Sequence, residues 1–219
     1  MREFAKRQPS AVLLAAQLAA ILIYPFLEEG AAGRAIFSVF GIAILGLVVL
    51  AVRSSSALTW VSVLLALPAT VLLLIQAVTG DDALLPYSSA FESVLYFYAG
   101  GALLFYMLED HEITRDELYA VGATFTLVAW AFAYAYVVCQ AIEPQSFTAA
   151  VDPRDARTWM ELLFLSFTTL TSTGLSDVVP VKPFARSLVM IEQIAGLGYV
   201  AMVVSRLVGL TLRATGRYP

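Results

Sequence analysis

The chain has 219 residues, of which 60% are hydrophobic and only 14% are charged, and its mean hydropathy is +0.81. Soluble proteins average about 45–50% apolar and about 25% charged residues, so this composition excludes an ordinary soluble domain and predicts an integral membrane protein. The net charge of −4 is spread over short loops without a basic block, so nucleic acid is not an expected partner. The single cysteine, Cys139, allows neither an intrachain disulfide nor a metal-binding pair and is interpreted as a packing residue.

The apolar runs of the chain predict an all-α fold with six transmembrane helices. A bilayer core about 30 Å thick requires about 20 apolar residues per helical span. The predicted spans are Ala11–Leu27, Ala35–Val52, Leu58–Val78, Ala90–Leu108, Leu118–Ile142 and Phe184–Leu210. We interpret the first as a retained helix and not a signal peptide, because no convincing cleavage site precedes Glu28.

The basic residues that flank the spans set the expected orientation, because cytoplasmic loops carry an excess of Lys and Arg. An N-terminus inside the cell places eight on the cytoplasmic side: Arg2, Lys6, Arg7, Arg53, Arg115, Arg206, Arg213 and Arg217. It leaves five on the outer side: Arg34, Arg154, Arg157, Lys182 and Arg186. This modest bias predicts a multi-pass protein of the cell membrane, such as a bacterial inner membrane, with both termini in the cytoplasm.

Residues 1–112 are predicted to form a four-helix transmembrane domain that lacks voltage-sensor charges. The fourth span, Ala90–Leu108, contains Glu92 but no Arg or Lys. A voltage sensor must carry several charges across the membrane field, at about 2.3 kcal/mol per charge per 100 mV. Voltage sensing by charge movement in this helix is therefore not expected.

The acidic connection Glu109–Glu117 follows the fourth span. Thr114 and Glu117 have the spacing of a capping box, which predicts the start of the fifth helix. His111, the only histidine, lies among the carboxylates of this connection. We interpret the connection as a solvated acidic loop, with sensing of pH or of divalent ions as the alternative.

Residues 113–219 are predicted to form a pore domain organised around Trp159–Pro180. The apolar first part, Trp159–Leu170, would extend about 18 Å as a helix, which reaches only the middle of a bilayer. The polar second part, Thr171–Asp177, is tolerated at that depth only where it is buried in protein or lines water. We therefore predict a re-entrant pore helix and polar return between the fifth and sixth spans, with the carbonyl end of the helix placed to stabilise a cation.

The stretch Ser166–Pro180, with Phe184–Arg186 and Ser205–Leu210, resembles the tetrameric potassium channels. More narrowly, it is similar to bacterial members with four uncharged helices before a two-helix pore. The resemblance is specific from Thr114 to Leu210 and is one of layout over the first four spans.

In that family the selectivity filter reads Thr-Val-Gly-Tyr-Gly-Asp, and its backbone carbonyls replace the water around K+. Following Thr171, these positions fall on Ser172, Thr173, Gly174, Leu175, Ser176 and Asp177. The resemblance implies that K+ is bound by the backbone carbonyls of Ser172, Thr173 and Gly174. The permeant ion, K+ or another monovalent cation, is then the ligand of the site, and no cofactor is expected.

Three filter positions depart from the family pattern. Thr173 replaces Val with little change of shape, and Leu175 removes the phenol that ties the filter to surrounding helices in the family. Ser176 replaces a glycine, where a side chain in a left-handed conformation would be strained by about 1–2 kcal/mol. Asp177 and Glu161 are expected to add negative charge near the mouth, which favours cations over anions. K+ preference is expected, with weakly selective cation passage and a non-conducting subunit as alternatives.

The sixth span contains three candidates for filter support and gating. Glu192 is an ionisable residue inside the membrane and so a functional candidate by default. The resemblance places it behind the filter, bonded to the pore helix. Gly196 and Gly198 lie near the middle of the span, where glycine either permits a gating bend or allows close helix packing.

Other functional classes fit the sequence less well. One pore loop cannot enclose a pathway, so a channel requires several copies, and the resemblance implies a homotetramer in membrane lipid. A secondary transporter would show a second half with a paired broken helix, which we do not find. An intramembrane protease would need a base beside Ser172 or Ser176, and His111 is in the predicted cytoplasmic loop, so no enzyme is expected. No ligand-binding module is expected after Leu210, and the sequence does not indicate the gating stimulus.

Overall fold

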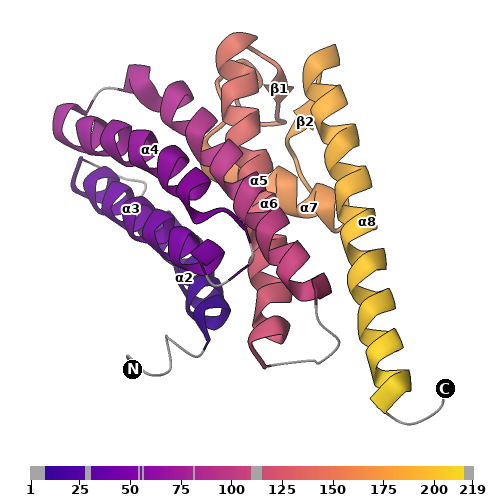
Figure 1. Ribbon diagram of the computed structural model, residues 1–219. Coiled ribbons are helices and arrows are strands. Elements are labelled where there is room, and N and C mark those ends of the chain that lie inside the picture. Colours follow the sequence, from indigo (N-terminus) through magenta and orange to yellow (C-terminus); the bar gives the residue numbers. More distant parts are fainter. Residues whose placement is uncertain are drawn as a thin grey trace.

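The computed structural model describes residues 8–27, 31–53, 55, 57–80, 82–109 and 115–214, which are mostly helical (Figure 1). The elements in chain order are α2 (Pro9–Leu27), α3 (Ala31–Arg53), α4 (Thr59–Thr79), the short 3-10 helix η1 (Asp82–Leu84), α5 (Leu85–Glu109), α6 (Arg115–Ile142), β1 (Phe147–Thr148), α7 (Trp159–Leu170), β2 (Val179–Pro180) and α8 (Pro183–Ala214).

Each predicted span coincides with one long helix. The largest difference is at α5, which begins at Leu85 instead of Ala90, because Pro86 is compatible with the first turn of a helix. Within the described residues, α2, α4, α5, α6 and α8 are long and apolar enough to cross a membrane, and a shorter apolar stretch, Ser38–Arg53, lies in α3. These helices support a multi-pass membrane protein, and the number of six spans stays a prediction.

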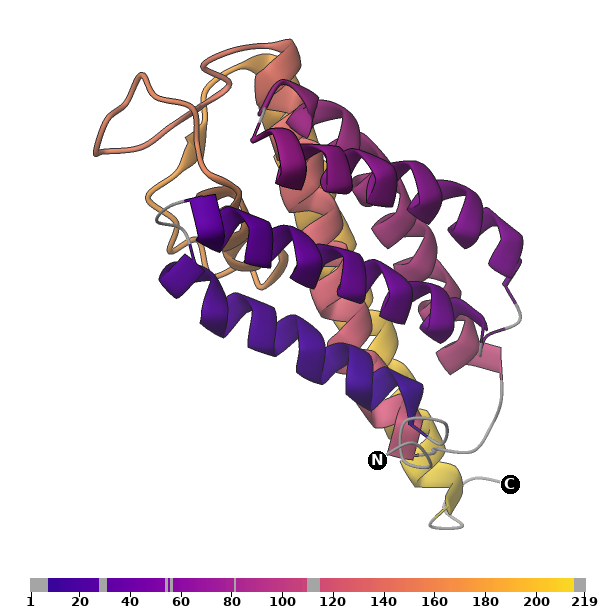
Figure 2. The ribbon, with the colours of Figure 1, turned by 90° about the vertical axis from the view of Figure 1, so that its left-hand side faces the viewer.

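Helix α6 lies in the middle of the molecule and contacts α2, α5, α7 and α8 (Figures 1 and 2). Its packing surface includes Ala129, Ala131 and Ala133, all fully buried. Small residues let helix backbones approach closely, which matters in lipid because no hydrophobic force joins the helices there. Helices α3 and α4 lie on one side of α6, and α8 lies on the other (Figure 1).

Polar contacts and one glycine position α2 against α6. Asp116 accepts hydrogen bonds from the Ser10 backbone N–H at 3.1 Å and the Ser10 hydroxyl at 2.9 Å, so it satisfies donors in the first turn of α2. Gly122 faces Leu14, and a Cβ at this glycine would lie 2.9 Å from a Leu14 methyl carbon. Helix α2 therefore fits α6 closely over its first two turns.

A buried cluster of aromatic rings joins the N-terminal helices to α7. Glu92 of α5 is almost fully buried, and the ring of Tyr96 on the same helix lies 5.7 Å from that of Tyr134 on α6, measured between ring centroids. The ring of Trp159, at the start of α7, lies 5.6 Å from Tyr134 and 5.4 Å from Tyr24 of α2, measured between ring centroids. One core thus includes residues of both predicted domains, 1–112 and 113–219, whose boundary falls within residues 110–114, outside the described residues.

The segment between α6 and α8 leaves and returns at the same end of the molecule. Strands β1 and β2 pair antiparallel, with Phe147 opposite Pro180 and Thr148 opposite Val179. Helix α7 lies between these strands in sequence and packs against both α6 and α8. The polar residues that follow α7 must therefore run back toward β2.

Candidate functional site

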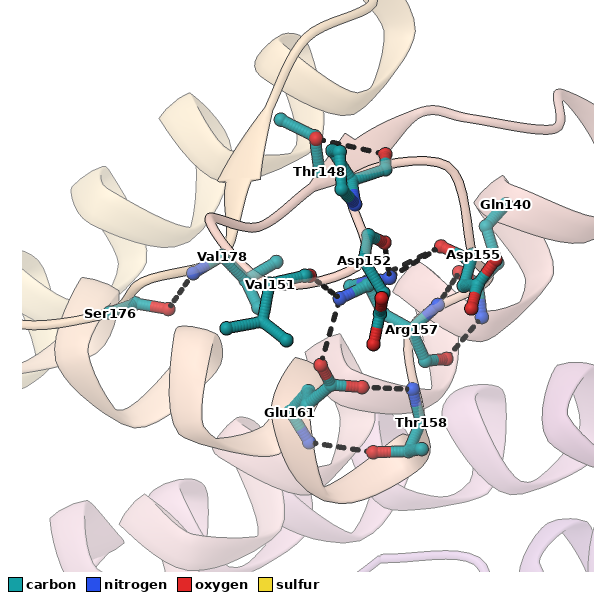
Figure 3. A network of polar contacts seen from close by, with 11 residues as sticks. Gln140, Thr148, Val151, Asp152, Asp155, Arg157, Thr158, Glu161, Ser176 and Val178 are labelled. Carbon is teal, nitrogen blue, oxygen red and sulfur yellow. Dashed lines mark hydrogen bonds and ion pairs between the residues drawn. The ribbon is translucent and has the colours of Figure 1, made fainter.

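Helix α7 begins with a capping box. The Glu161 backbone N–H donates to the Thr158 hydroxyl at 3.3 Å, and the Thr158 N–H donates to the Glu161 carboxylate at 2.6 Å. The other carboxylate oxygen pairs with Arg157 at 3.0 Å (Figure 3). The carboxylate of Glu161 therefore caps the helix, and the guanidinium compensates part of its charge. A contribution of Glu161 to the charge at the mouth stays a prediction.

Helix α7 ends in a Schellman motif, in which the N–H groups beyond the last turn fold back onto its carbonyls. The Ser172 N–H donates to the Thr169 carbonyl at 3.0 Å. The N–H groups of Thr173 and Gly174 donate to the Thr168 carbonyl at 3.0 and 3.2 Å. Ser172 occupies the position that usually requires glycine, and its φ is 57°.

These bonds fix the direction of three filter carbonyls, where the filter segment is defined as Thr171–Asp177. In a trans peptide the N–H and the preceding C=O point in opposite directions. Because the amides of residues 172–174 point at α7, the carbonyls of Thr171, Ser172 and Thr173 point away from it. Two of these residues, Ser172 and Thr173, belong to the predicted set of K+ ligands. These bonds do not orient the carbonyl of Gly174, the third, and the ligand set stays a prediction.

The orientation of the filter carbonyls continues the dipole of α7. The last carbonyls of a helix carry about half a negative charge in total. Here the carbonyls of Thr168 and Thr169 accept hydrogen bonds from N–H groups of the filter segment. The carbonyl oxygens that point onward from the C-terminal end of α7 are therefore those of the filter segment. Residues 171–175 are exposed in the single chain. The arrangement can offer several partly negative oxygens to a cation from one side.

The outer half of the filter segment differs from the prediction. The backbone φ angle of Ser176 is not positive, whereas φ is 57° at Ser172 and 64° at Gly174. The prediction of strain at Ser176 is therefore wrong. The Ser176 hydroxyl instead accepts from the Val178 N–H at 3.0 Å, a local turn that needs no left-handed residue. The Leu175 side chain is 76% exposed, and Asp177 is also exposed.

Glu192 connects three helices behind the filter segment. Its carboxylate is fully buried and accepts hydrogen bonds from the hydroxyls of Tyr136 on α6 and Ser166 on α7. The Ser166 oxygen also lies 2.8 Å from the Ala129 carbonyl, and its single proton serves one acceptor at a time. The expected contact between Glu192 and the helix before the filter is present. Tyr136 and Ser166 were not predicted.

Gly196 allows α8 to touch the last residue of α7. A Cβ at Gly196 would lie 2.3 Å from the Leu170 carbonyl oxygen and 2.8 Å from its Cα, which are backbone atoms that cannot rotate aside. Close packing is therefore what the structure shows at this glycine. A Cβ at Gly198 would meet no atom within 4 Å in the chain. A role of either residue as a gating bend stays a prediction.

Several predicted features are not part of this arrangement. His111 and Thr114 lie outside the described residues, whereas Glu117 is described and pairs with Arg206 of α8 at 3.4 Å. Cys139 is buried in α6, as a packing residue would be. Among the residues that the structure describes, no group of three or more His, Cys, Asp or Glu side chains is arranged to hold a metal ion.

Comparison with known protein families finds a match over part of the chain. Residues 122–213, from α6 through α7 and the filter segment into the end of α8, match a family model described as ion channel. The match supports an ion channel family and points to a channel and not to an enzyme. Searches of curated proteins and of solved structures found no match.

We predict that Gly196→Ala destabilises the protein and that Gly198→Ala does not. The new methyl group at position 196 would overlap the Leu170 backbone, and overpacking of this kind typically costs about 1–3 kcal/mol. Thermal unfolding of the two purified variants in detergent provides the measurement, with Gly198→Ala as the matched control. Equal melting temperatures for both variants would contradict the close contact.

We also predict that Glu192→Leu lowers the melting temperature by leaving the buried Tyr136 hydroxyl without its partner, at about 1–3 kcal/mol. Adding Tyr136→Phe to Glu192→Leu removes the unpaired hydroxyl, so the double variant should melt higher than Glu192→Leu alone. Melting temperatures of the two single variants and the double variant complete the cycle. Strictly additive effects would show that the two side chains are not coupled.

Proposed function

We propose that the chain is one subunit of a homotetrameric cation channel that passes K+ through the filter segment Thr171–Asp177. The observation that carries the proposal is the common direction of the Thr171, Ser172 and Thr173 carbonyls, away from α7 and at the exposed edge of the chain. Rings of such carbonyls can replace the hydration shell of K+. One chain supplies oxygens from one side only, so an ion pathway requires further copies.

The outward face of α8 fits a role as contact surface between copies. Ile194 and Leu197, near the middle of this helix, are 72% and 68% exposed, and Met190 and Val200 continue the apolar surface. An apolar face is compatible with lipid, yet the filter segment beside it is polar and equally exposed. Polar backbone at membrane depth must be covered by protein or line water, and assembly of copies around an axis meets both needs.

The same proposal covers location and gating. The subunit is placed in the cell membrane with both termini in the cytoplasm, and α7 enters and leaves from the outer side. Helix α5 has no Lys or Arg, so we propose that the channel is not gated by charge movement in this helix. The alternatives are a weakly selective cation channel and a non-conducting subunit, because the outer half of the filter has neither the tyrosine nor the second glycine of the potassium channels.

Reconstituted protein in liposomes with opposed K+ and Na+ gradients is expected to show cation over anion selectivity and a reversal potential shifted toward that of K+. Gly174→Val is the matched control, because φ is 64° at this position and a β-branched residue cannot adopt that conformation without strain. The variant should lose the current. Preferential Cl− passage, or the same current with Gly174→Val, would overturn the proposal.

A second measurement addresses the unusual outer half of the filter. Leu175→Tyr and Ser176→Gly each restore a residue of the potassium-channel filter, and we expect the two together to increase the K+ over Na+ permeability ratio under bi-ionic conditions. Leu175→Phe, which adds a ring of similar size without the hydroxyl, is the control for Leu175→Tyr. An unchanged ratio in the double variant would show that these positions do not set selectivity.

A further inference from the structure

Arg157 is buried in a segment that is otherwise exposed. The side chains of residues 150–156 are exposed, whereas Arg157 is only 6% exposed. A guanidinium cannot lose its charge in a protein, so its burial requires hydrogen-bond acceptors on all sides. The acceptors that surround it therefore indicate what this side chain holds in place.

The guanidinium of Arg157 donates hydrogen bonds to the turn that precedes it in the chain (Figure 3). Its Nη2 donates to the carbonyls of Asp152 at 2.6 Å and Asp155 at 2.8 Å, and its Nε also donates to Asp155 at 3.1 Å. Its Nη1 donates to the Val151 carbonyl at 3.3 Å and to the Glu161 carboxylate at 3.0 Å. One planar side chain thus joins the 151–155 turn to the first turn of α7.

The 151–155 turn is also hydrogen-bonded to β1, which pairs with β2. Thr148 of β1 donates from its hydroxyl to the Pro153 carbonyl at 3.0 Å. Strand β1 pairs with β2, and the Val181 N–H donates to the Ser146 carbonyl at 2.9 Å. β2 begins two residues after Asp177, at the exit of the filter segment. The backbone of Arg157 itself is bound on both sides by Gln140 of α6, at 2.8 and 3.0 Å.

We infer that Arg157 is a positioning residue that holds both ends of the filter segment. Through Glu161 it fixes the start of α7, whose other end leads into the filter. Through the 151–155 turn, β1 and β2 it fixes the chain that leaves the filter. The inference rests on the proposed function insofar as residues 171–177 are an ion filter, but the placement of these residues can be measured without any ion current.

The arrangement requires arginine and not merely a positive charge. Four acceptor groups surround the guanidinium, and its five N–H donors lie in one rigid plane that matches them. A lysine ammonium has three donors at one point and would retain the pair with Glu161 while losing part of the turn. Arg154, three residues earlier and exposed, offers a matched control of the same residue type in the same segment.

Hydrogen exchange measured by mass spectrometry on the full chain in lipid nanodiscs tests the inference. Six N–H groups report on the filter segment and its exit: those of residues 171–174, 178 and 181. In Arg157→Gln we expect their exchange to accelerate by about tenfold or more, because the bonds that hold both flanks are lost. Arg157→Lys retains the pair with Glu161 and loses part of the turn, so we expect a smaller acceleration there. Arg154→Gln should exchange as the wild type does.

Glu161→Gln provides a second test that does not depend on the folding of Arg157 variants. Glutamine retains the capping box but removes the charged partner of Arg157, so exchange at residues 171–174 should rise by less than in Arg157→Gln. Acceleration confined to residues 151–158 in the Arg157 variants, or wild-type protection in Arg157→Lys or in Glu161→Gln, would overturn the inference. If the wild type carries no cation current while these exchange differences are found, the proposed function fails and the positioning role stands.

Discussion

The backbone N–H groups of residues 172–174 are bound to the last turn of α7, and the candidate site depends on this constraint. A peptide plane cannot point its N–H and its C=O in the same direction, so each bond to α7 sends one filter carbonyl the opposite way. Because the filter segment takes its geometry from α7, any change in the position of α7 moves the carbonyls with it. The surrounding contacts therefore matter for what they do to this short helix.

Contacts from three directions hold α7. From behind, Glu192 binds Ser166 and links it to α6 and α8. At the C-terminal end, Gly196 lets α8 rest against the Leu170 backbone, and at the N-terminal end the carboxylate of Glu161 caps the helix and pairs with Arg157. On α7 itself the side chain of Phe164 stays 47% exposed, and residues 171–175 are exposed beyond its C-terminal end. Residues far apart in the sequence thus fix the position of one short element.

The long helices could be predicted from the sequence because a membrane span requires a long apolar run, and such a run can be recognised without knowledge of tertiary contacts. The sequence was also sufficient to place a short helix and a polar return between α6 and α8. It was insufficient for Ser176, because the alignment with the family placed the strained position there, whereas the left-handed residue is Ser172. It also gave no sign that Glu161 caps α7 and pairs with Arg157. Tyr136 and Ser166 are ordinary helix residues until folding brings them to Glu192, and no local pattern marks them.

The fit between α2 and α6 bears on whether the two-helix part of the chain is modular. The carboxylate of Asp116 accepts a hydrogen bond from the Ser10 hydroxyl, and the Leu14 side chain packs against Gly122 where other residues would carry a Cβ. Without α2, the Asp116 carboxylate would lose both donors from Ser10, and the surface of α6 at Gly122 would lose the Leu14 side chain that packs against it. The part that matches the ion channel family, residues 122–213, therefore begins on a helix whose one side is covered by α2.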